Sequence, residues 1–193
     1  MKTTNIKFLI VCLMLITGIT GAYNSVYARE KKEERKARKE AEKYMLTANY
    51  YAQDTILNLR EFVLEADYLQ GRYGQLIPVS SKINFVKVLG EKGTIQTGNP
   101  LYVGSYGNGL GGDTAEGNIS NYKVSGNPKS LTHRISFDLI TSGLGTYNIV
   151  INVMADNTAS ATITNATSMR LTWKGELVAL FNANIFKGMD TYR

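Results

Sequence analysis

Few of the side chains that most often do chemistry occur in this chain of 193 residues. His133 is the only histidine, so a metal site made of several histidine ligands is excluded by number. No serine stands in the Gly-x-Ser-x-Gly pattern that exposes a nucleophile at a strand-to-helix turn. His133 follows Thr132 at the start of an expected strand, where a surface imidazole is the simplest interpretation. We therefore expect no catalytic residue, no metal site and no cofactor.

Acidic residues fall in two places where paired carboxylates could act. Glu65 and Asp67 share one face of an expected strand, and a glycosidase needs two such carboxyl groups. The alternative, which we favour, is the solvent-exposed face of an alternating strand. Asp113 and Glu116 lie close together in the sequence, but they lack the alternating Asp and Asn ligands of a calcium loop. Neither pair predicts an enzyme.

The most unusual composition lies at residues 104–117, which read GSYGNGLGGDTAEG. No Gly-Lys-Ser or Gly-Lys-Thr ends the segment, so it is not a phosphate-binding P-loop. It leads into residues 118–124, which look like a strand, whereas a dinucleotide-binding turn leads into a helix. We expect a loop whose glycines allow positive φ and close backbone approach. Such a loop has room to form a lid or a rim over a cavity.

Residues 1–28 read as a secretory signal peptide that precedes all of these candidates. Lys2 and Lys7 form a basic start. Phe8–Tyr23 is apolar and uncharged, and Val26-Tyr27-Ala28 offers a small-x-small cleavage site. The alternative is a retained membrane anchor, but a spanning helix needs about 20 predominantly apolar residues and this run is shorter. We predict an exported protein, periplasmic or secreted, that contacts a membrane only if the signal remains uncleaved.

The single cysteine and much of the net charge belong to, or border on, that segment. Cys12 follows Val11 in the middle of the apolar run, which does not fit the lipid-attachment site of a lipoprotein. Cleavage after Ala28 would leave a chain without cysteine and therefore without disulfides. It would also lower the formal charge from +6 to +4, of which residues 29–43 contribute +3. The rest of the chain is close to neutral, and we expect no nucleic-acid partner.

Residues 29–60 are predicted to form one helix, charged at first and amphipathic later. Its first half interleaves acids and bases at four-residue spacing, as in Glu34 with Arg38, which is typical of a solvated helix. The alternative is a basic helix that binds anionic lipid or an envelope polymer. In the second half, apolar residues at three- and four-residue steps predict a buried face. These residues are Met45, Ala48, Ala52, Ile56 and Leu59.

Residues 61–193 are predicted to form an antiparallel β-barrel domain. From about residue 61 the hydrophobic period changes from 3.6 to 2, and short alternating runs are separated by turns rich in glycine and asparagine. Ile135, Phe137 and Leu139 form one such run. A meander of about eight strands must close into a barrel or fold into a sandwich, and one helix before it can cap an end. The expected class is mainly β, a barrel preceded by one long helix.

Five short motifs, taken in order, resemble a known family. They are Phe62-Val63-Leu64-Glu65-Ala66, Asn84-Phe85-Val86, Leu101–Tyr106, Gly111–Gly117 and Trp173-Lys174-Gly175. Together they make residues 40–185 similar to the uncharacterised domain-of-unknown-function family 4251, whose members are exported proteins of Bacteroidetes-type bacteria. Pro100 precedes Leu101 here, whereas the family has the proline after the leucine. The resemblance implies a lipocalin-like β-barrel and an envelope location, and it supplies no catalytic residue.

Two functions follow as hypotheses. The first is a non-enzymatic binding protein that holds a small apolar ligand in the barrel, with Tyr102, Tyr106 and Trp173 at the mouth. Against it stands the interpretation that these three aromatic residues only pack the core. The second is an envelope structural or interaction protein whose N-terminal helix contacts an envelope protein.

Overall fold

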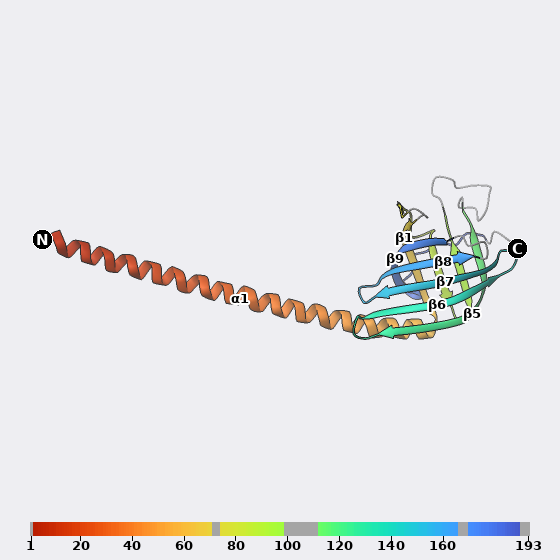
Figure 1. Ribbon diagram of the computed structural model, residues 1–193, viewed down its shortest axis with the longest axis horizontal. Helices are drawn as coiled ribbons and strands as arrows, with labels where there is room; N and C mark the ends of the chain where they lie inside the picture. The colour runs from red at the N-terminus through yellow and green to blue at the C-terminus, as the bar shows by residue number, and fades with distance from the viewer. Residues whose placement is uncertain (1, 71–73, 99–111, 166–169, 190–193) are drawn as a thin grey trace. The chain divides into compact units, whose positions relative to one another are not determined.

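The computed structural model describes residues 2–70, 74–98, 112–165 and 170–189, with side chains from residue 29 onward. The chain divides into two compact units, residues 1–45 and 46–193. Helix α1 spans Lys2–Leu59 and contributes its last turns to the second unit, which also contains all the strands (Figure 1). Within the described part of the chain, no helix is long and apolar enough to cross a membrane.

The second unit is an antiparallel β-barrel. Its strands are β1 (Glu61–Gln70), β2 (Leu76–Pro78), β3 (Phe85–Leu89), β4 (Lys92–Gln96), β5 (Thr114–Asn127), β6 (Thr132–Thr141), β7 (Gly145–Met154), β8 (Thr158–Asn165) and β9 (Arg170–Ala179). Strands β3 to β9 pair in sequence order, and β1 pairs with both β3 and β9. This closes an eight-stranded barrel, to which β2 adds by pairing with β1 alone. The predicted fold class is therefore confirmed.

Alternate residues of each strand fill the barrel, as the two-residue period requires. Phe62 and Leu64 of β1 face Val88 and Val86 of β3 across the pair, and all four are buried in one cluster. Each large apolar side chain that is fully removed from water contributes about 1.5–3 kcal/mol to folding. The interior of the barrel is thus a packed apolar core, which stabilises the positions of the strand ends.

Residues 46–59 of α1 contact the end of the barrel where β5 meets β6 and β7 meets β8. Leu57 is fully buried and belongs to the barrel core, and Gln53 and Tyr50 are buried one and two turns before it. The predicted buried face is wrong for Met45, Ala48, Ala52 and Leu59, which are exposed, whereas Ile56 is partly buried against the core. The helix is rotated because Gln53 Nε2 donates hydrogen bonds of 2.8 Å to Met154 O and to Asn157 Oδ1.

Strand β1 contains an irregularity opposite Gly175 of β9. The β1–β9 register shifts between Ala66 and Tyr68, and Gly175 pairs with Ala66. A Cβ on Gly175 would lie 1.9 Å from Glu65 O. The bulge therefore brings the two backbones so close that only glycine fits at position 175.

Candidate ligand site at the barrel mouth

One end of the barrel is hollow, and it is the end away from residues 46–59. Here β4, β6 and β8 end and β5, β7 and β9 begin. A cavity of about 210 Å³ lies among these strand ends. Its apolar lining is formed by Ile95, Ala115, Leu144, Ile163, Leu171 and Trp173. Thr97, Asp113, Tyr147 and Asn165 supply polar atoms.

Hydrogen bonds hold the strand ends beside the cavity. Thr97 N–H donates to Asp113 O at 2.8 Å, and Asp113 N–H donates to Thr97 Oγ1 at 3.3 Å. Gln96 pairs with Thr114 in the adjoining register position. Because β4 and β5 are tied together up to the rim, this part of the cavity wall is preformed, as is usual for small-molecule sites.

Trp173 is the most informative residue of the cavity. It pairs with Ala161 of β8 and Leu69 of β1, so its strand position turns the indole into the barrel. The side chain is fully buried, and its Nε1–H has no hydrogen-bond partner among the described residues. A buried donor without an acceptor costs about 1–3 kcal/mol, and such groups are rare in native proteins. Among the described residues, the indole N–H of this cavity-lining residue therefore lacks an acceptor.

The predicted site residues have different outcomes. Trp173 lines the cavity, whereas Tyr102 and Tyr106 lie outside the described residues. Sequence reasoning missed Leu144 and Tyr147. Leu144 stands in the glycine-containing turn between β6 and β7, where no periodicity in the sequence marks a residue as facing the cavity. Tyr147 has the parity of Ile149 and Ile151 in β7, and that alternation is the signal that could have found it.

The acidic pairs do not form a site. Glu65 Oε1 accepts a hydrogen bond from Asn184 N–H at 2.7 Å, and the β1 irregularity falls at Asp67. Thr114 to Gly117 belong to β5, so the expected loop is shorter at this end and Glu116 lies on a strand. Among the described residues, no group of three or more histidine, cysteine or acidic side chains is arranged to hold a metal ion.

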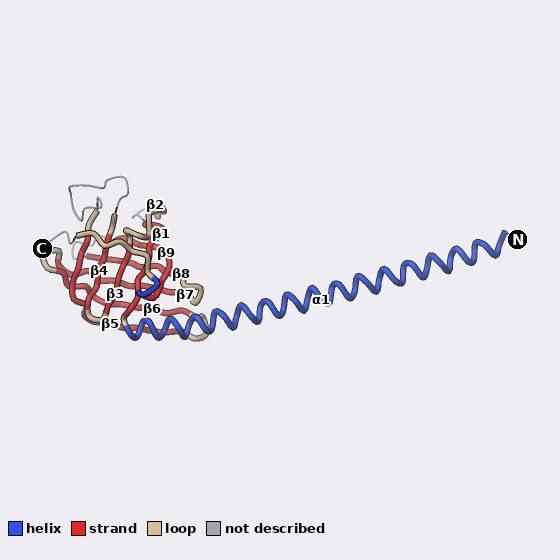
Figure 2. The backbone as a smooth tube through the Cα atoms, turned by 180° about the vertical axis from the view of Figure 1, so that it is seen from behind, coloured by secondary structure: helices blue, strands red, loops and turns tan. Residues whose placement is uncertain are grey.

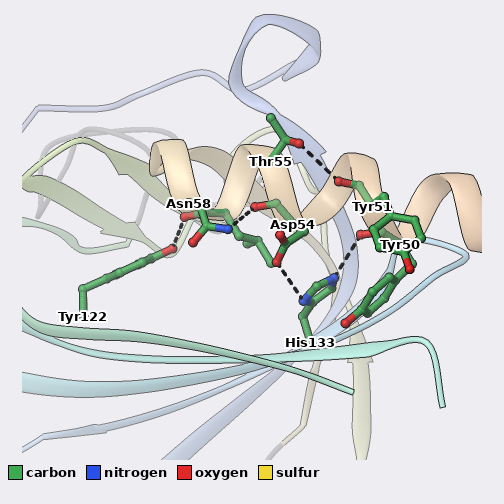
Figure 3. Close-up of polar contacts among 8 residues, drawn as sticks. Tyr50, Tyr51, Asp54, Thr55, Asn58, Tyr122 and His133 are labelled. Carbon is green, nitrogen blue, oxygen red and sulfur yellow. Dashed lines mark hydrogen bonds and ion pairs between the residues drawn. The ribbon is translucent and has the colours of Figure 1, made fainter. Parts of the chain in front are cut away.

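His133 lies at the opposite end of the barrel, beneath α1 (Figure 3). The expectation of a surface imidazole is wrong, since this residue is 1 % exposed. Its Nε2 lies 3.0 Å from Tyr50 O and must donate, because a carbonyl can only accept. Nδ1 lies 3.9 Å from Asp54 Oδ1 and makes no hydrogen bond among the described residues. The imidazole therefore joins helix to barrel, and no nucleophile is bonded to it.

Tyr122 forms a second link between β5 and α1. Its hydroxyl donates to Leu57 O at 2.7 Å, and the Arg60 guanidinium lies 4.5 Å from its ring centroid. Burial raises the pKa of Tyr122 to about 12, although the charge of Arg60 opposes the shift. The last turn of α1 is thereby fixed to the barrel by a neutral phenol.

Comparison with known proteins agrees with this architecture. No curated protein matches the chain. A crystal structure at 1.95 Å of a DUF4251 family protein from Bacteroides eggerthii DSM 20697 is similar, with 35 % identity and a TM-score of 0.60. The match covers 72 % of this chain and 93 % of that one. Residues 44–177 match the family described as Domain of unknown function (DUF4251). These residues include all of β1 to β8 and most of β9, and the chain belongs to the DUF4251 family.

Proposed function

We propose that the protein binds a small, largely apolar ligand that carries a hydrogen-bond acceptor, in the cavity at the barrel mouth. The observation that carries this proposal is a cavity lined mainly by apolar side chains, one of which, the buried indole of Trp173, has no partner for its Nε1–H among the described residues. An acceptor on the ligand would remove the cost of that unsatisfied donor. Apolar cavities of roughly 150 Å³ hold one aromatic ring, so about 210 Å³ suits a molecule of similar size.

A matched pair of probes tests the role of the donor. Acetophenone and α-methylstyrene have nearly the same shape, because a C=CH2 group replaces the C=O group, but only acetophenone has an acceptor. We expect acetophenone to bind at least about tenfold more tightly, which corresponds to ~1.4 kcal/mol. Trp173 is the only tryptophan, so its indole N–H gives a single resonance in a proton–nitrogen spectrum, which should move on binding.

The variant Trp173→Phe keeps an aromatic ring and removes the donor. It should bind both probes with equal affinity, measured from the backbone amide shifts of Ala115 and Ile163. The proposal fails if neither probe binds the wild-type protein, or if the preference for acetophenone persists in the variant. If the proposal holds, mass spectrometry of the purified protein identifies any natural small molecule that remains bound.

We place this binding protein outside the cytoplasm, with residues 1–28 removed as a signal peptide. The basic start, the uncharged apolar run and the small-x-small site support this placement. Expression in a bacterial host, followed by intact-mass measurement, tests it. A chain that begins at Arg29 in the periplasmic fraction is expected, and an uncleaved cytoplasmic chain would contradict export.

A second function is favoured by the exposure of the charged part of α1. Every residue from 29 to 45 is exposed, and acids alternate with bases throughout residues 29–43. Within this stretch, Lys36 and Glu40 form an ion pair of 4.0 Å. Such a helix surface is suited to an envelope protein partner of mixed charge. Deletion of residues 29–43 should then abolish capture of that partner while residues 46–193 remain folded, and unchanged capture would refute this role.

A further inference from the structure

A segment at the end of the chain runs along the outside of the barrel. The 3₁₀ turn η1 (Leu180–Asn182) follows β9, and residues 183–189, here called the tail, continue without helix or strand from Ala183, whose backbone is extended. Figure 2 shows this stretch crossing the sheet in front of β3 and β4. The tail is therefore a strand-like segment that lies on a face of the sheet instead of at its edge.

The tail is held through its backbone at every second residue. Asn184 N–H donates to Glu65 Oε1, and Phe186 N–H donates to Lys82 O, both at 2.7 Å. The side-chain amide of Gln96 bridges the next two positions. It donates to Phe186 O at 2.8 Å and accepts from Gly188 N–H at 2.7 Å. Alternate use of backbone groups is how a β-strand is recognised, and here one glutamine side chain takes the place of a neighbouring strand.

The groove beneath the tail has features that suit it to bind an extended backbone. Gln96 is fully buried, and its amide is oriented by Ile83 O and by Thr114 Oγ1, each at 3.3 Å. Val63 and Phe85 point away from the barrel core, yet both are fully buried. A polar side chain that is buried on the outer face together with apolar neighbours indicates a groove with a specific occupant.

One side chain of the tail adds charge recognition. Lys187 Nζ forms an ion pair with Glu116 of β5, and the same carboxylate accepts from Thr94 Oγ1 at 3.0 Å. The groove therefore accepts an extended backbone with a basic residue at this position. Charge complementarity at Glu116 is the feature that an experiment can reverse without altering the apolar floor.

The link between β9 and the tail is weakly anchored, whereas Ala183, Ile185 and Gly188 of the tail itself are partly buried. None of the residues of η1 is buried, and the side chains of Phe181, Phe186 and Met189 are 85 %, 64 % and 71 % exposed. Segments with few buried apolar contacts open locally at low free-energy cost. Opening at η1 would leave the groove of the same chain empty and its tail free to enter another.

We propose that the groove also accepts the tail of a second copy of this chain, so that two molecules exchange tails reciprocally. The tail of a second copy is complementary to the groove, because it has the same sequence as the tail that occupies the groove of its own chain. It would offer the same backbone groups and the same lysine. Exchange of an identical segment gives a closed two-fold dimer and is a low-cost route to association. This surface lies on the outer face of β1, β3 and β4 and is separate from the cavity at the barrel mouth.

Two charge-reversal variants of the full chain test the exchange. In Lys187→Glu the tail and the groove both carry a negative charge at this contact. In Glu116→Lys they both carry a positive charge, so in each variant the tail is repelled by the groove of its own chain. In a mixture the two tails are attracted to the grooves of the opposite variant. We expect a heterodimer with one copy of each variant in native mass spectrometry, and a dissociation constant at least about tenfold lower than for either variant alone.

Controls separate tail exchange from general charge attraction. Lys129→Glu and Glu91→Lys change the same charges in turns outside the groove, and their mixture should stay monomeric. Adding Gln96→Leu to both reversal variants should abolish the heterodimer while circular dichroism shows an intact barrel. The proposal is overturned if the mixture of reversal variants remains monomeric, if the turn variants dimerise equally, or if Gln96→Leu has no effect.

Discussion

The imidazole ring of His133 lies nearly parallel to the phenol ring of Tyr50, with the ring centroids 4.2 Å apart and an angle of 11° between the planes (Figure 3). Both residues are buried, and one comes from β6 while the other comes from α1. The same imidazole also bonds to the backbone oxygen of Tyr50. This β6 residue thus acts with Gln53 and Tyr122 to set how residues 46–59 of α1 lie on the barrel end.

Replacement of His133 should therefore weaken the attachment of α1. His133→Ala removes a stacked ring and a buried hydrogen bond, and we expect the free energy of unfolding to fall by about 2–4 kcal/mol. Urea denaturation followed by circular dichroism measures this change. Arg134→Ala is the matched control, because its side chain is exposed and donates a hydrogen bond to Asn152 at the surface. Equal losses in the two variants would contradict a specific role for His133.

The rotation of α1 shows which part of the site was hidden from the sequence. The apolar pattern favoured a face containing Met45 and Leu59, but burial of Gln53 overrides it, because its amide satisfies carbonyl and amide oxygens at the β7–β8 turn. Hydrophobic periodicity cannot predict burial of a polar side chain whose partners are 100 residues away. His133 differs, since it has the parity of Ile135 and Phe137 in β6, and that alternation is the signal that could have replaced the wrong expectation of a surface imidazole.

Tyr122 should make the protein sensitive to alkaline conditions. Its folded pKa is about 12, above the value near 10 of an unfolded tyrosine. The neutral phenol therefore contributes stability that is complete below about pH 10 and is lost as the pH rises through about 12. We expect the urea midpoint to fall over that range, less steeply in Tyr122→Phe. Part of the fall should remain, because burial and then the charge of Asp54 also raise the pKa of Tyr50.

Asp138 should titrate below its ordinary range. Asn121 Nδ2 and Asn148 Nδ2 donate to its two carboxylate oxygens at 2.7 and 2.9 Å, and these bonds lower the pKa of Asp138 against a small effect of burial. Its contribution to stability is present above the unfolded pKa and is lost as the pH falls through the lower folded pKa.

Carbon NMR of the Asp138 carboxyl group measures this directly. Asn121→Gly is the appropriate variant, since Asn121 has a φ of 54° that glycine tolerates. The titration midpoint should rise toward the usual value in this variant. Asn152→Ala, on the strand beside Asp138 but bonded to Arg134, should leave the midpoint unchanged. A midpoint that is insensitive to Asn121 would show that the hydrogen bond does not set the pKa.

The strands of the barrel could be predicted from the sequence because inward-facing apolar residues alternate with outward-facing residues along each of them. Ile149, Ile151 and Val153 of β7 are all buried, as their spacing predicts. Closure depends on pairing between β1 and β9, more than 100 residues apart in the chain, which alternation alone does not distinguish from a sandwich. The family resemblance supplied that step. The cavity depends on which inward residues leave space at the mouth, and this is decided by packing and not by residue type.

Two strand glycines differ in what a methyl group would meet: Gly175, where β9 pairs with β1, and Gly93 of β4. A Cβ on Gly175 would meet backbone, with Glu65 O at 1.9 Å and Ala66 Cα at 2.9 Å. A Cβ on Gly93 would meet only side-chain atoms, the nearest being Leu139 Cδ1 at 2.8 Å. Side chains can change rotamer at a cost of about 1–3 kcal/mol, whereas two hydrogen-bonded strands must separate.

We therefore expect Gly175→Ala to prevent closure of the barrel, with loss of a cooperative urea transition, while Gly93→Ala folds with a free energy of unfolding lower by about 1–3 kcal/mol. Both variants replace a strand glycine by the same residue, so the difference reports the kind of atom that each new methyl group meets. Amide hydrogen exchange measures closure at the strands concerned. Protection of the amides in β1 and β9 should be lost in Gly175→Ala and kept in Gly93→Ala. Retained protection of β9 in Gly175→Ala would mean that the β1 bulge can shift and that the close approach at Glu65 is not required for closure.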